Sequence, residues 1–198
     1  MKPFRRVSGP AAPLLMDDVN TDQIAPATSD FAPDYAALLF ARWRAEPDFV
    51  LAREPFRHAR ILVTGNNFGC GSSRESAVWA LAAFGIRCVV ARSFADIFRE
   101  NALKNGVLPV VFDGDDASAF ERVVVAVDGA GPFHVDLEAQ TIATPDGTLF
   151  AFPMPAADRE TLLRGLDDIG LTLVHGEEIE RWETRMQTEL PWAQQVAR

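Results

Sequence analysis

The sequence has little of what several common protein classes require. Its 198 residues include only two cysteines, Cys70 and Cys88, so no disulfide framework is expected and a cytoplasmic location is the default. Two thiols are also too few to hold an iron–sulfur cluster within this chain. No apolar run approaches the roughly 18 residues of a membrane-spanning helix. The segment before Pro10 is basic without an apolar stretch, which excludes a secretory signal.

Positive charge is scarce as well. There are 19 lysines and arginines against 28 aspartates and glutamates, and the net charge is -9. A nucleic-acid-binding surface needs clustered basic side chains, so nucleic acid is not expected as a partner. Hydrophobic residues make up 48% of the chain, including 14 phenylalanines, which is typical of a globular protein with a substantial core. The length fits one domain over residues 1–198, and no linker divides it.

The most regular pattern lies between Arg60 and Phe112. Three apolar runs predict buried strands, and two helical segments that end near Gly85 and Gly106 separate them. Ser93 is expected to cap the second helix, with Asp96 in its first turn. The predicted strands are 61–63, 88–91 and 107–112, and the predicted helices are 75–84 and 93–105. Strands that alternate with helices predict a parallel βαβαβ core.

The pattern changes after Asp113. Short apolar segments separated by glycine-containing turns predict an antiparallel meander of strands at 123–127, 133–137, 141–143 and 148–152. The acidic run 113–116 is expected to be a solvated loop. Helices are expected at 156–164, 165–173 and 177–186, followed by a tail at 191–198. The predicted fold is therefore an α/β domain in which a meander and C-terminal helices are added to a parallel core.

The turn Gly-Cys-Gly-Ser-Ser-Arg at residues 69–74 lies between the first predicted strand and its helix. Backbone N–H groups, the hydroxyls of Ser72 and Ser73, and the Arg74 guanidinium are expected to meet there, which suits an anion such as a carboxylate. An ordinary strand-to-helix turn capped by Ser72 or Ser73 is the alternative. Arg74 favours the anion, because a cation in the first turn of a helix is otherwise unfavourable. Cys70 lies between two glycines, and this pattern does not predict a core residue.

Other glycine-rich motifs fit this turn poorly. A Walker A loop needs Lys directly after its last glycine, and here Ser72 follows Gly71. A dinucleotide-binding fingerprint needs a third glycine where Arg74 stands. The nucleophile elbow of serine hydrolases, G-x-S-x-G, is also absent. Nucleotide binding and serine hydrolysis are therefore not the expected functions.

Residues 67–75, NFGCGSSRE, resemble the signature of the small subunit of 3-isopropylmalate dehydratase. That family is similar to the swivelling C-terminal domain of aconitase. The resemblance continues, in the same order, through residues 20–24, 93–98, 104–109 and 163–173, and so covers most of the chain. It implies a three-layer β/β/α swivelling domain.

The resemblance also implies roles for the residues of the turn. Ser72 matches the serine that acts as base on the substrate carbon, and Arg74 matches the arginine that holds a substrate carboxylate. Ser73 and Asp22 match positions close to the same site, and Cys70 and Gly71 belong to the same substrate-binding turn. For Asp22, a purely turn-forming role is the alternative. A serine hydroxyl serves as a base only where its alkoxide is stabilised, here by helix-end N–H groups and Arg74.

The reaction implied by the resemblance is the loss and re-addition of water that interconverts 2-isopropylmalate and 3-isopropylmalate in leucine biosynthesis. It uses a [4Fe–4S] cluster as a Lewis acid. Because this chain cannot supply the thiolates, the cluster is expected in a large subunit, with which the chain forms an active heterodimer or heterotetramer. A related 2-alkylmalate or homoaconitate-type hydratase and a non-catalytic anion-binding paralogue remain alternatives.

The chain departs from the family pattern in two places. Ser76 stands where the family usually has His, and residues 25–54 are shorter and match poorly. Residues 27–35 contain no Lys or Arg, which favours a substrate whose variable group is apolar over one with a third carboxylate. Near the C-terminus, Trp182 and Trp192 are candidates for contact with the large subunit, since aromatic residues are favoured at interfaces.

Overall fold

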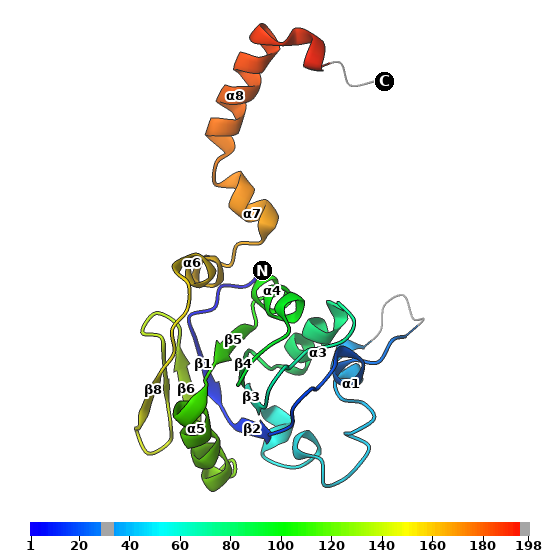
Figure 1. Ribbon diagram of the computed structural model, residues 1–198, viewed down its shortest axis with the longest axis vertical. Helices are drawn as coiled ribbons and strands as arrows, with labels where there is room; N and C mark the ends of the chain where they lie inside the picture. Colours follow the sequence, from blue (N-terminus) through cyan, green and yellow to red (C-terminus); the bar gives the residue numbers. More distant parts are fainter. Residues whose placement is uncertain (29–33, 195–198) are drawn as a thin grey trace.

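The computed structural model describes residues 1–28 and 34–194 and contains two four-stranded sheets (Figure 1). The first is parallel, with the strands in the order β2 (Ala11–Leu14), β3 (Ile61–Thr64), β4 (Cys88–Ala91) and β5 (Leu108–Val111). The second is antiparallel, in the order β1 (Arg6–Gly9), β6 (Phe133–Asp136), β7 (Thr141–Ala143) and β8 (Leu149–Ala151). The N-terminal segment contributes one strand to each sheet.

The helices of the described residues are α1 (Thr21–Ile24), α2 (Tyr35–Leu38), α3 (Ser76–Phe84), α4 (Asp96–Lys104), α5 (Gly114–Val127), α6 (Ala156–Arg164), α7 (Asp168–Leu173) and α8 (Gly176–Glu189). Helices α3 and α4 alternate with β3, β4 and β5, as the sequence predicts. Short 3-10 helices lie at Val50–Ala52, Phe56–His58 and Pro191–Gln194. Within residues 1–28 and 34–194, no helix combines the length and the apolarity needed to cross a membrane.

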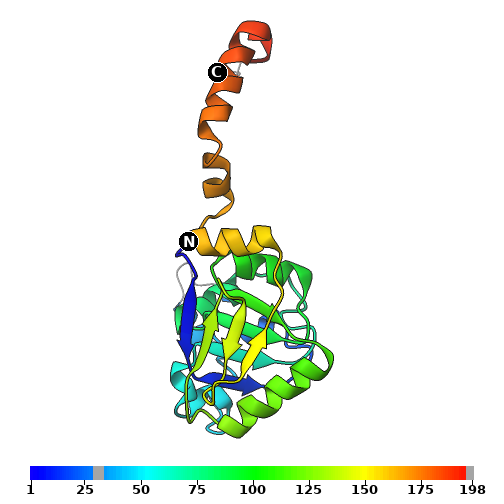
Figure 2. The same ribbon diagram turned by 90° about the vertical axis from the view of Figure 1, so that its left-hand side faces the viewer.

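The parallel sheet is buried on both faces. Every residue of β3 and β4 is buried, as expected for central strands covered on two sides. On one face, Leu62 and Val89 pack in a core with the buried side of α3. On the other, Ile61 and Val90 belong to a second core shared with α5 and the antiparallel sheet. Figure 2 shows that outer sheet, with α5 and α6 near its two ends. The three layers are helices, parallel sheet and antiparallel sheet, which confirms the predicted swivelling β/β/α architecture.

Most of the predicted elements are confirmed within one or two residues. Strands β3, β4 and β5 and helix α6 occupy the predicted places, as do the strands near 133, 141 and 149. The helices α7 and α8 also form, and α8 is longer than expected. The end of the tail expected at 191–198 lies outside the described residues.

The predicted strand at 123–127 is wrong, because these residues form the last turns of α5. Ala117, Phe120 and Val124 are buried at helical spacing against the second core, and this packing outweighs the strand preference of the valine run. The acidic run 113–116 is not a loop either. Asp113 precedes α5, and Asp115 and Asp116 lie in its first turn, where negative charge suits the helix dipole.

The predicted cap at Ser93 is wrong, and the alternative cap at Ser72 or Ser73 does not form either. Helix α3 begins at Ser76 after Glu75, so neither Ser72 nor Ser73 caps it and Arg74 precedes the helix. Helix α4 begins after Ala95, and the Ser93 hydroxyl instead accepts a hydrogen bond of 2.8 Å from the backbone N–H of Asn67. The Ser93 side chain therefore connects the loop after β4 to the loop after β3.

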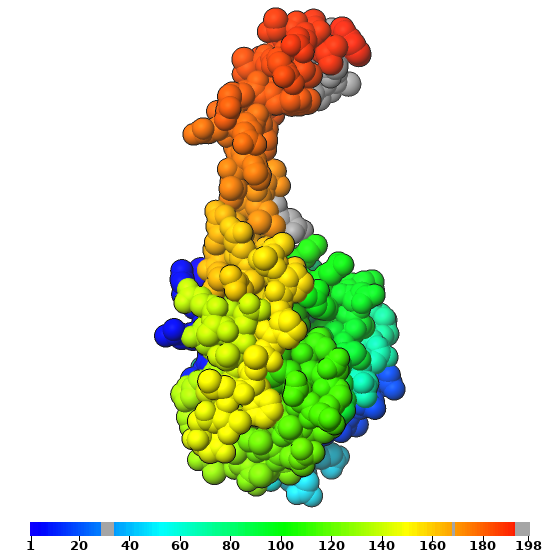
Figure 3. Space-filling view, turned by 60° about the vertical axis from the view of Figure 1, so that its left-hand side comes forward, coloured from blue at the N-terminus to red at the C-terminus, as the bar shows by residue number. Residues whose placement is uncertain are grey.

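Helices α7 and α8 form an arm that extends away from the two sheets (Figures 1 and 3). Residues 168–192 will be called the C-terminal arm. No residue of α8 is buried. The arm displays large apolar side chains to solvent, namely Ile169, Leu171, Leu173, Val174, Trp182, Leu190 and Trp192.

The packing of the core between the sheets predicts that two substitutions in α5 have very different effects on the free energy of unfolding. Phe120 is 1% exposed, and its ring lies 5.1 Å from Phe112 and 5.8 Å from Phe133 between ring centroids. Phe120→Ala should lower the free energy of unfolding by about 3–5 kcal/mol. Val125, 52% exposed on the same helix, is the control, and Val125→Ala should change it by less than about 0.5 kcal/mol. Urea unfolding followed by circular dichroism measures both values, and equal losses would contradict this packing.

Candidate active site

The loops that follow β2, β3 and β4 meet at the carboxyl edge of the parallel sheet. They enclose a pocket of about 260 Å³ between the turn after β3 and the start of α4. The pocket is lined by Thr21, Gly69, Gly71, Ser72, Ser73, Arg74, Ala95, Asp96, Ile97, Phe98 and Asn101. The carboxyl edge is where open parallel sheets commonly bind ligands.

The turn after β3 lies directly against α4. Gly69 has a φ of +80°, and a Cβ atom there would lie 2.1 Å from the Phe98 ring, so only glycine fits. Phe68 packs edge-on against Phe98, with ring centroids 5.1 Å apart. The backbone of Phe68 also exchanges hydrogen bonds of 3.0 Å with the Ser93 carbonyl and the Ala95 N–H. The turn and the first residues of α4 therefore form one rigid wall of the pocket.

Helix α1 holds the other side of the turn. The backbone N–H of Thr21 donates to the Cys70 carbonyl at 3.0 Å, and the Thr21 hydroxyl donates to the Ser72 carbonyl at 2.8 Å. The Arg74 guanidinium donates to the Asp22 carboxylate. Two segments about fifty positions apart in the chain are thus joined at three points. We call the segment Asn20–Gln23 the clamp.

The clamp is itself locked by a capping box. The Asn20 side chain accepts a hydrogen bond of 2.9 Å from the Gln23 backbone N–H, and the Gln23 side chain accepts one of 2.7 Å from the Asn20 backbone N–H. These reciprocal bonds give partners to backbone N–H groups that the first turn of a helix otherwise leaves without a hydrogen bond. A helix of four residues thereby becomes a defined support for Thr21 and Asp22.

The ion pair with Asp22 orients Arg74. Both side chains are partly exposed, so solvent screens the pair and its contribution to stability is small. Its effect is geometric. A guanidinium carries five N–H donors in a planar fork, and contact with Asp22 at Nη1 sets the direction of that fork beside the pocket. The arrangement suits a planar anion such as a carboxylate.

A polar network beyond the pocket joins α3 to α4. The Asn105 amide donates to the Glu75 carboxylate at 2.8 Å and accepts a hydrogen bond of 3.1 Å from the Trp79 indole. Glu75 immediately follows Arg74, so this network fixes the turn where it enters α3. The Trp79 indole also packs edge-on against Tyr35 of α2, with centroids 5.3 Å apart.

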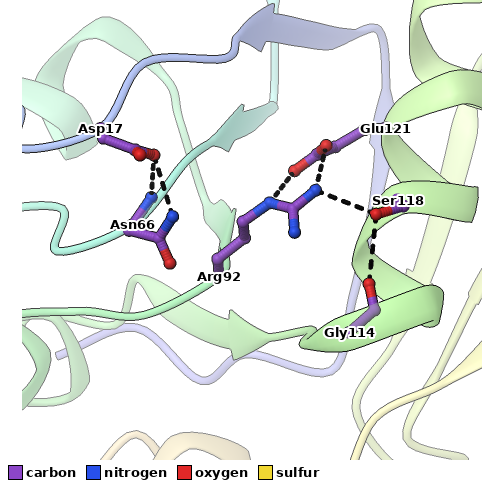
Figure 4. Close-up of polar contacts among 6 residues, drawn as sticks. All are labelled: Asp17, Asn66, Arg92, Gly114, Ser118 and Glu121. Carbon is purple, nitrogen blue, oxygen red and sulfur yellow. Dashed lines mark hydrogen bonds and ion pairs between the residues drawn. The ribbon is translucent and has the colours of Figure 1, made fainter.

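Figure 4 shows how the neighbouring loops at this edge are tied together. Arg92, just after β4, makes a bidentate contact with Glu121 of α5 at 2.8 and 2.7 Å, and this hydrogen bonding raises the pKa of Arg92. Asp17, after β2, accepts hydrogen bonds from the backbone and side chain of Asn66, which lower the pKa of the Asp17 carboxyl. These contacts connect the loops to one another and to α5.

The structure brings most of the predicted site residues together. Gly71, Ser72, Ser73 and Arg74 line the pocket, and Asp22 contacts Arg74 beside it. Cys70 is not among the lining residues, and its thiol donates to the Asp18 carbonyl at 3.4 Å. Ser76 is half-buried as the first residue of α3.

Sequence reasoning missed Thr21 and the α4 residues of the pocket wall. Thr21 directly precedes Asp22, but its side-chain partner lies about fifty residues away, and no local pattern reveals it. The location of Asp96–Phe98 soon after β4 was a usable signal, because the carboxyl ends of neighbouring parallel strands meet at one edge.

The thiols of this chain do not fit an iron–sulfur cluster. Cys88 lies in the fully buried strand β4, where burial raises the pKa of its thiol well above the ordinary value. Cys70 belongs to the turn at the pocket. Among residues 1–28 and 34–194, no group of three or more His, Cys, Asp or Glu side chains is arranged to hold a metal ion.

Comparison with known proteins places this architecture in a defined class. Residues 36–115 match the family model of the aconitase C-terminal domain, and residues 168–196 match that of the C-terminal domain of the 3-isopropylmalate dehydratase small subunit. The crystal structure of 3-isopropylmalate dehydratase from Methanocaldococcus jannaschii superposes with a TM-score of 0.63 at 25% identity, covering 90% of this chain and 99% of that one. The fold is that of an aconitase-type swivelling domain.

Curated relatives define the family. The 3-isopropylmalate dehydratase small subunit of Rhodospirillum centenum is 48% identical over 98% of this chain and 99% of its own length. The protein of the same name from Rhizobium meliloti is 44% identical over 98% and 100%. The chain belongs to the 3-isopropylmalate dehydratase small subunit family.

The two cysteines should differ sharply in reactivity. Cys70 is partly exposed in the turn, whereas Cys88 is buried and its raised pKa keeps it in the unreactive thiol form. Ellman's reagent at a mildly alkaline pH should label one thiol rapidly in the native chain and the second only in denaturant. Cys70→Ser should remove the rapid labelling and leave only the thiol that reacts in denaturant. Rapid labelling of both thiols in the folded chain would contradict the burial of β4.

Proposed function

We propose that this chain supplies two groups of the active site of a 3-isopropylmalate dehydratase. Ser72 is the base, and Arg74 binds a carboxylate of the substrate. The observation that carries the proposal is the pocket in which Ser72, Ser73 and Arg74 lie together, with Arg74 oriented by Asp22. The reaction is the interconversion of 2-isopropylmalate and 3-isopropylmalate in leucine biosynthesis.

Ser72 is exposed and lines the pocket, so a substrate bound there can contact it. In the proposed reaction it removes a proton from the carbon next to a substrate carboxylate, and returns a proton to the neighbouring carbon on rehydration. Negative charge develops on that carboxylate as the proton leaves, and the guanidinium of Arg74 stabilises it. A nearby cation also favours the alkoxide form of Ser72. Exclusion of water would strengthen both effects.

The remaining half of the site is assigned to a large subunit. The pocket opens to solvent at Ser72 and Ser73, both of which are exposed. A covering chain would close it. We assign the [4Fe–4S] cluster to this large subunit, since the thiols here do not fit it; when bound there, it supplies a Lewis acid for the leaving hydroxyl. The assembly is proposed to be a heterodimer or heterotetramer in the cytoplasm.

The apolar wall of the pocket supports a substrate with an alkyl group. Ala95, Ile97 and Phe98 line it, and Ile97 is half-exposed towards solvent. A third carboxylate would need a basic partner, and residues 27–35, part of which lie outside the described residues, contain no Lys or Arg. These features favour isopropylmalate over a tricarboxylic substrate.

The C-terminal arm is proposed to contact the large subunit. Its exposed apolar residues, including Trp182 and Trp192, are of the kind that interfaces bury. The family model that matches residues 168–196 is named for the small subunit of this dehydratase, which is consistent with a role of the arm in assembly.

Replacement of the proposed base tests the catalytic assignment. The chain is co-expressed with the large subunit encoded in the same organism, and turnover of 2-isopropylmalate is measured on the purified complex. Ser72→Ala should lower kcat by at least about 100-fold, as expected when a general base is lost, while co-purification and Tm stay unchanged. Near-normal turnover by the assembled Ser72→Ala complex would refute Ser72 as the base. Turnover of homoaconitate in preference to isopropylmalate would support the related hydratase instead.

A matched pair of leucines tests the arm. Leu173 in the arm and Leu149 in the edge strand β8 are 69% and 66% exposed. Leu173→Ser should weaken binding to the large subunit by about tenfold or more, because a buried leucine contributes about 1.5–3 kcal/mol. Leu149→Ser should leave binding unchanged. The affinity for the large subunit is measured by calorimetry or by pull-down titration. Equal affinity of both variants would contradict the proposed contact between the arm and the large subunit.

A further inference from the structure

We propose that Thr21 is a positioning residue that sets the orientation of Ser72 through its backbone carbonyl. This inference rests on the proposed role of Ser72 as the base. It gives a role to Thr21, which lines the pocket but has no part in the proposed chemical steps.

The contact is a buried, directed hydrogen bond. Thr21 is only 2% exposed, and its hydroxyl donates to the Ser72 carbonyl at 2.8 Å. The backbone N–H of the same residue donates to the Cys70 carbonyl at 3.0 Å. Thr21 therefore holds the turn on both sides of Gly71, at the carbonyls of the residues before and after it.

The turn needs this support because of its own composition. Gly71 has a φ of +85° and, as a glycine, has a wide range of accessible backbone conformations. The Ser72 carbonyl also accepts a hydrogen bond of 2.7 Å from the backbone N–H of Arg74, which closes the turn locally, and the bond from the Thr21 hydroxyl attaches the same peptide to α1. The hydrogen bond from Thr21 holds that peptide plane against α1 and so fixes the Cα–Cβ bond from which the Ser72 hydroxyl takes its rotamers. Displacement of a reacting group by about 1 Å costs on the order of 100-fold in rate.

The support is itself immobile. Thr21 is the first residue of α1, whose capping box joins Asn20 to Gln23. Asp22, the next residue, contacts Arg74. The two residues proposed to act on the substrate, Ser72 and Arg74, are thus held in register by neighbouring positions of one helical turn.

A second threonine of the chain provides a matched control. Thr64, at the end of β3, is 1% exposed, and its hydroxyl also donates to a loop carbonyl, that of Met16, at 3.2 Å. Thr64 does not line the pocket, and its hydroxyl bonds to the segment after β2 rather than to the turn of residues 70–74. Thr→Val at either position keeps the branched shape and removes one buried hydroxyl donor.

The experiment compares Thr21→Val, Thr21→Ser and Thr64→Val in the complex with the large subunit. Thr21→Val should lower kcat about 10- to 100-fold with KM changed less than about threefold, because an interaction that matters for the reacting geometry is lost rather than substrate binding. Thr21→Ser retains the hydroxyl and should restore kcat to within about threefold of the parent. Thr64→Val should show a similar decrease in Tm and a normal kcat.

The proposal is overturned if Thr21→Val keeps kcat within about threefold of the parent. It is also overturned if Thr64→Val loses as much kcat, or if Thr21→Val no longer assembles, because a positioning role leaves the complex intact. Ser72→Ala in the same assay separates the positioning role from the base assignment. Loss of turnover in Ser72→Ala with normal turnover in Thr21→Val refutes the positioning role alone. Normal turnover in Ser72→Ala refutes the base assignment and the positioning role together.

Discussion

The contact between the clamp and the turn after β3 is the interaction on which the rest of the site depends. Thr21 binds the carbonyls of Cys70 and Ser72, and Asp22 binds Arg74. Each hydrogen bond contributes only about 1 kcal/mol to stability. Their importance is geometric, since they attach a glycine-containing turn to helix α1. The capping box of α1 and the packing of Gly69 on Phe98 make both sides of that contact rigid.

The two cores of the domain make this contact possible. The parallel sheet is buried on one face by α3 and on the other by α5 and the antiparallel sheet, so its carboxyl edge is a fixed frame. Loops from three strands meet along that edge, and Arg92 and Asp17 tie them together (Figure 4). A loop on such a frame can carry an exposed serine in a defined place while remaining open to solvent on one side. An open pocket of this kind is consistent with the proposed sharing of an active site with a large subunit.

Much of the fold could be predicted because apolar periodicity reports burial. The central strands, α6 and the meander near 133–151 follow from it. The failures have physical causes. The valines of 123–127 favour a strand in isolation. Phe120 and Val124 are buried at helical spacing, however, and this tertiary packing stabilises helix α5 instead. Ser93 has the composition of a helix cap, yet its hydroxyl accepts from Asn67 across the sheet edge. Caps and short valine runs are poorly predicted for the same reason, since their partners are distant in sequence.

By itself the sequence determined the residue types of the turn, the alternation of strands and helices and, through the resemblance of residues 67–75, the family and the candidate residues Ser72 and Arg74. These are local properties, encoded by composition and spacing along a few neighbouring residues. Only the tertiary structure decided that Arg74 precedes α3, that Asp22 pairs with it and that Thr21 supports Ser72. The contacts of Asp22 with Arg74 and of Thr21 with Ser72 join segments about fifty residues apart. They exist because the carboxyl ends of β2 and β3 lie side by side in the sheet.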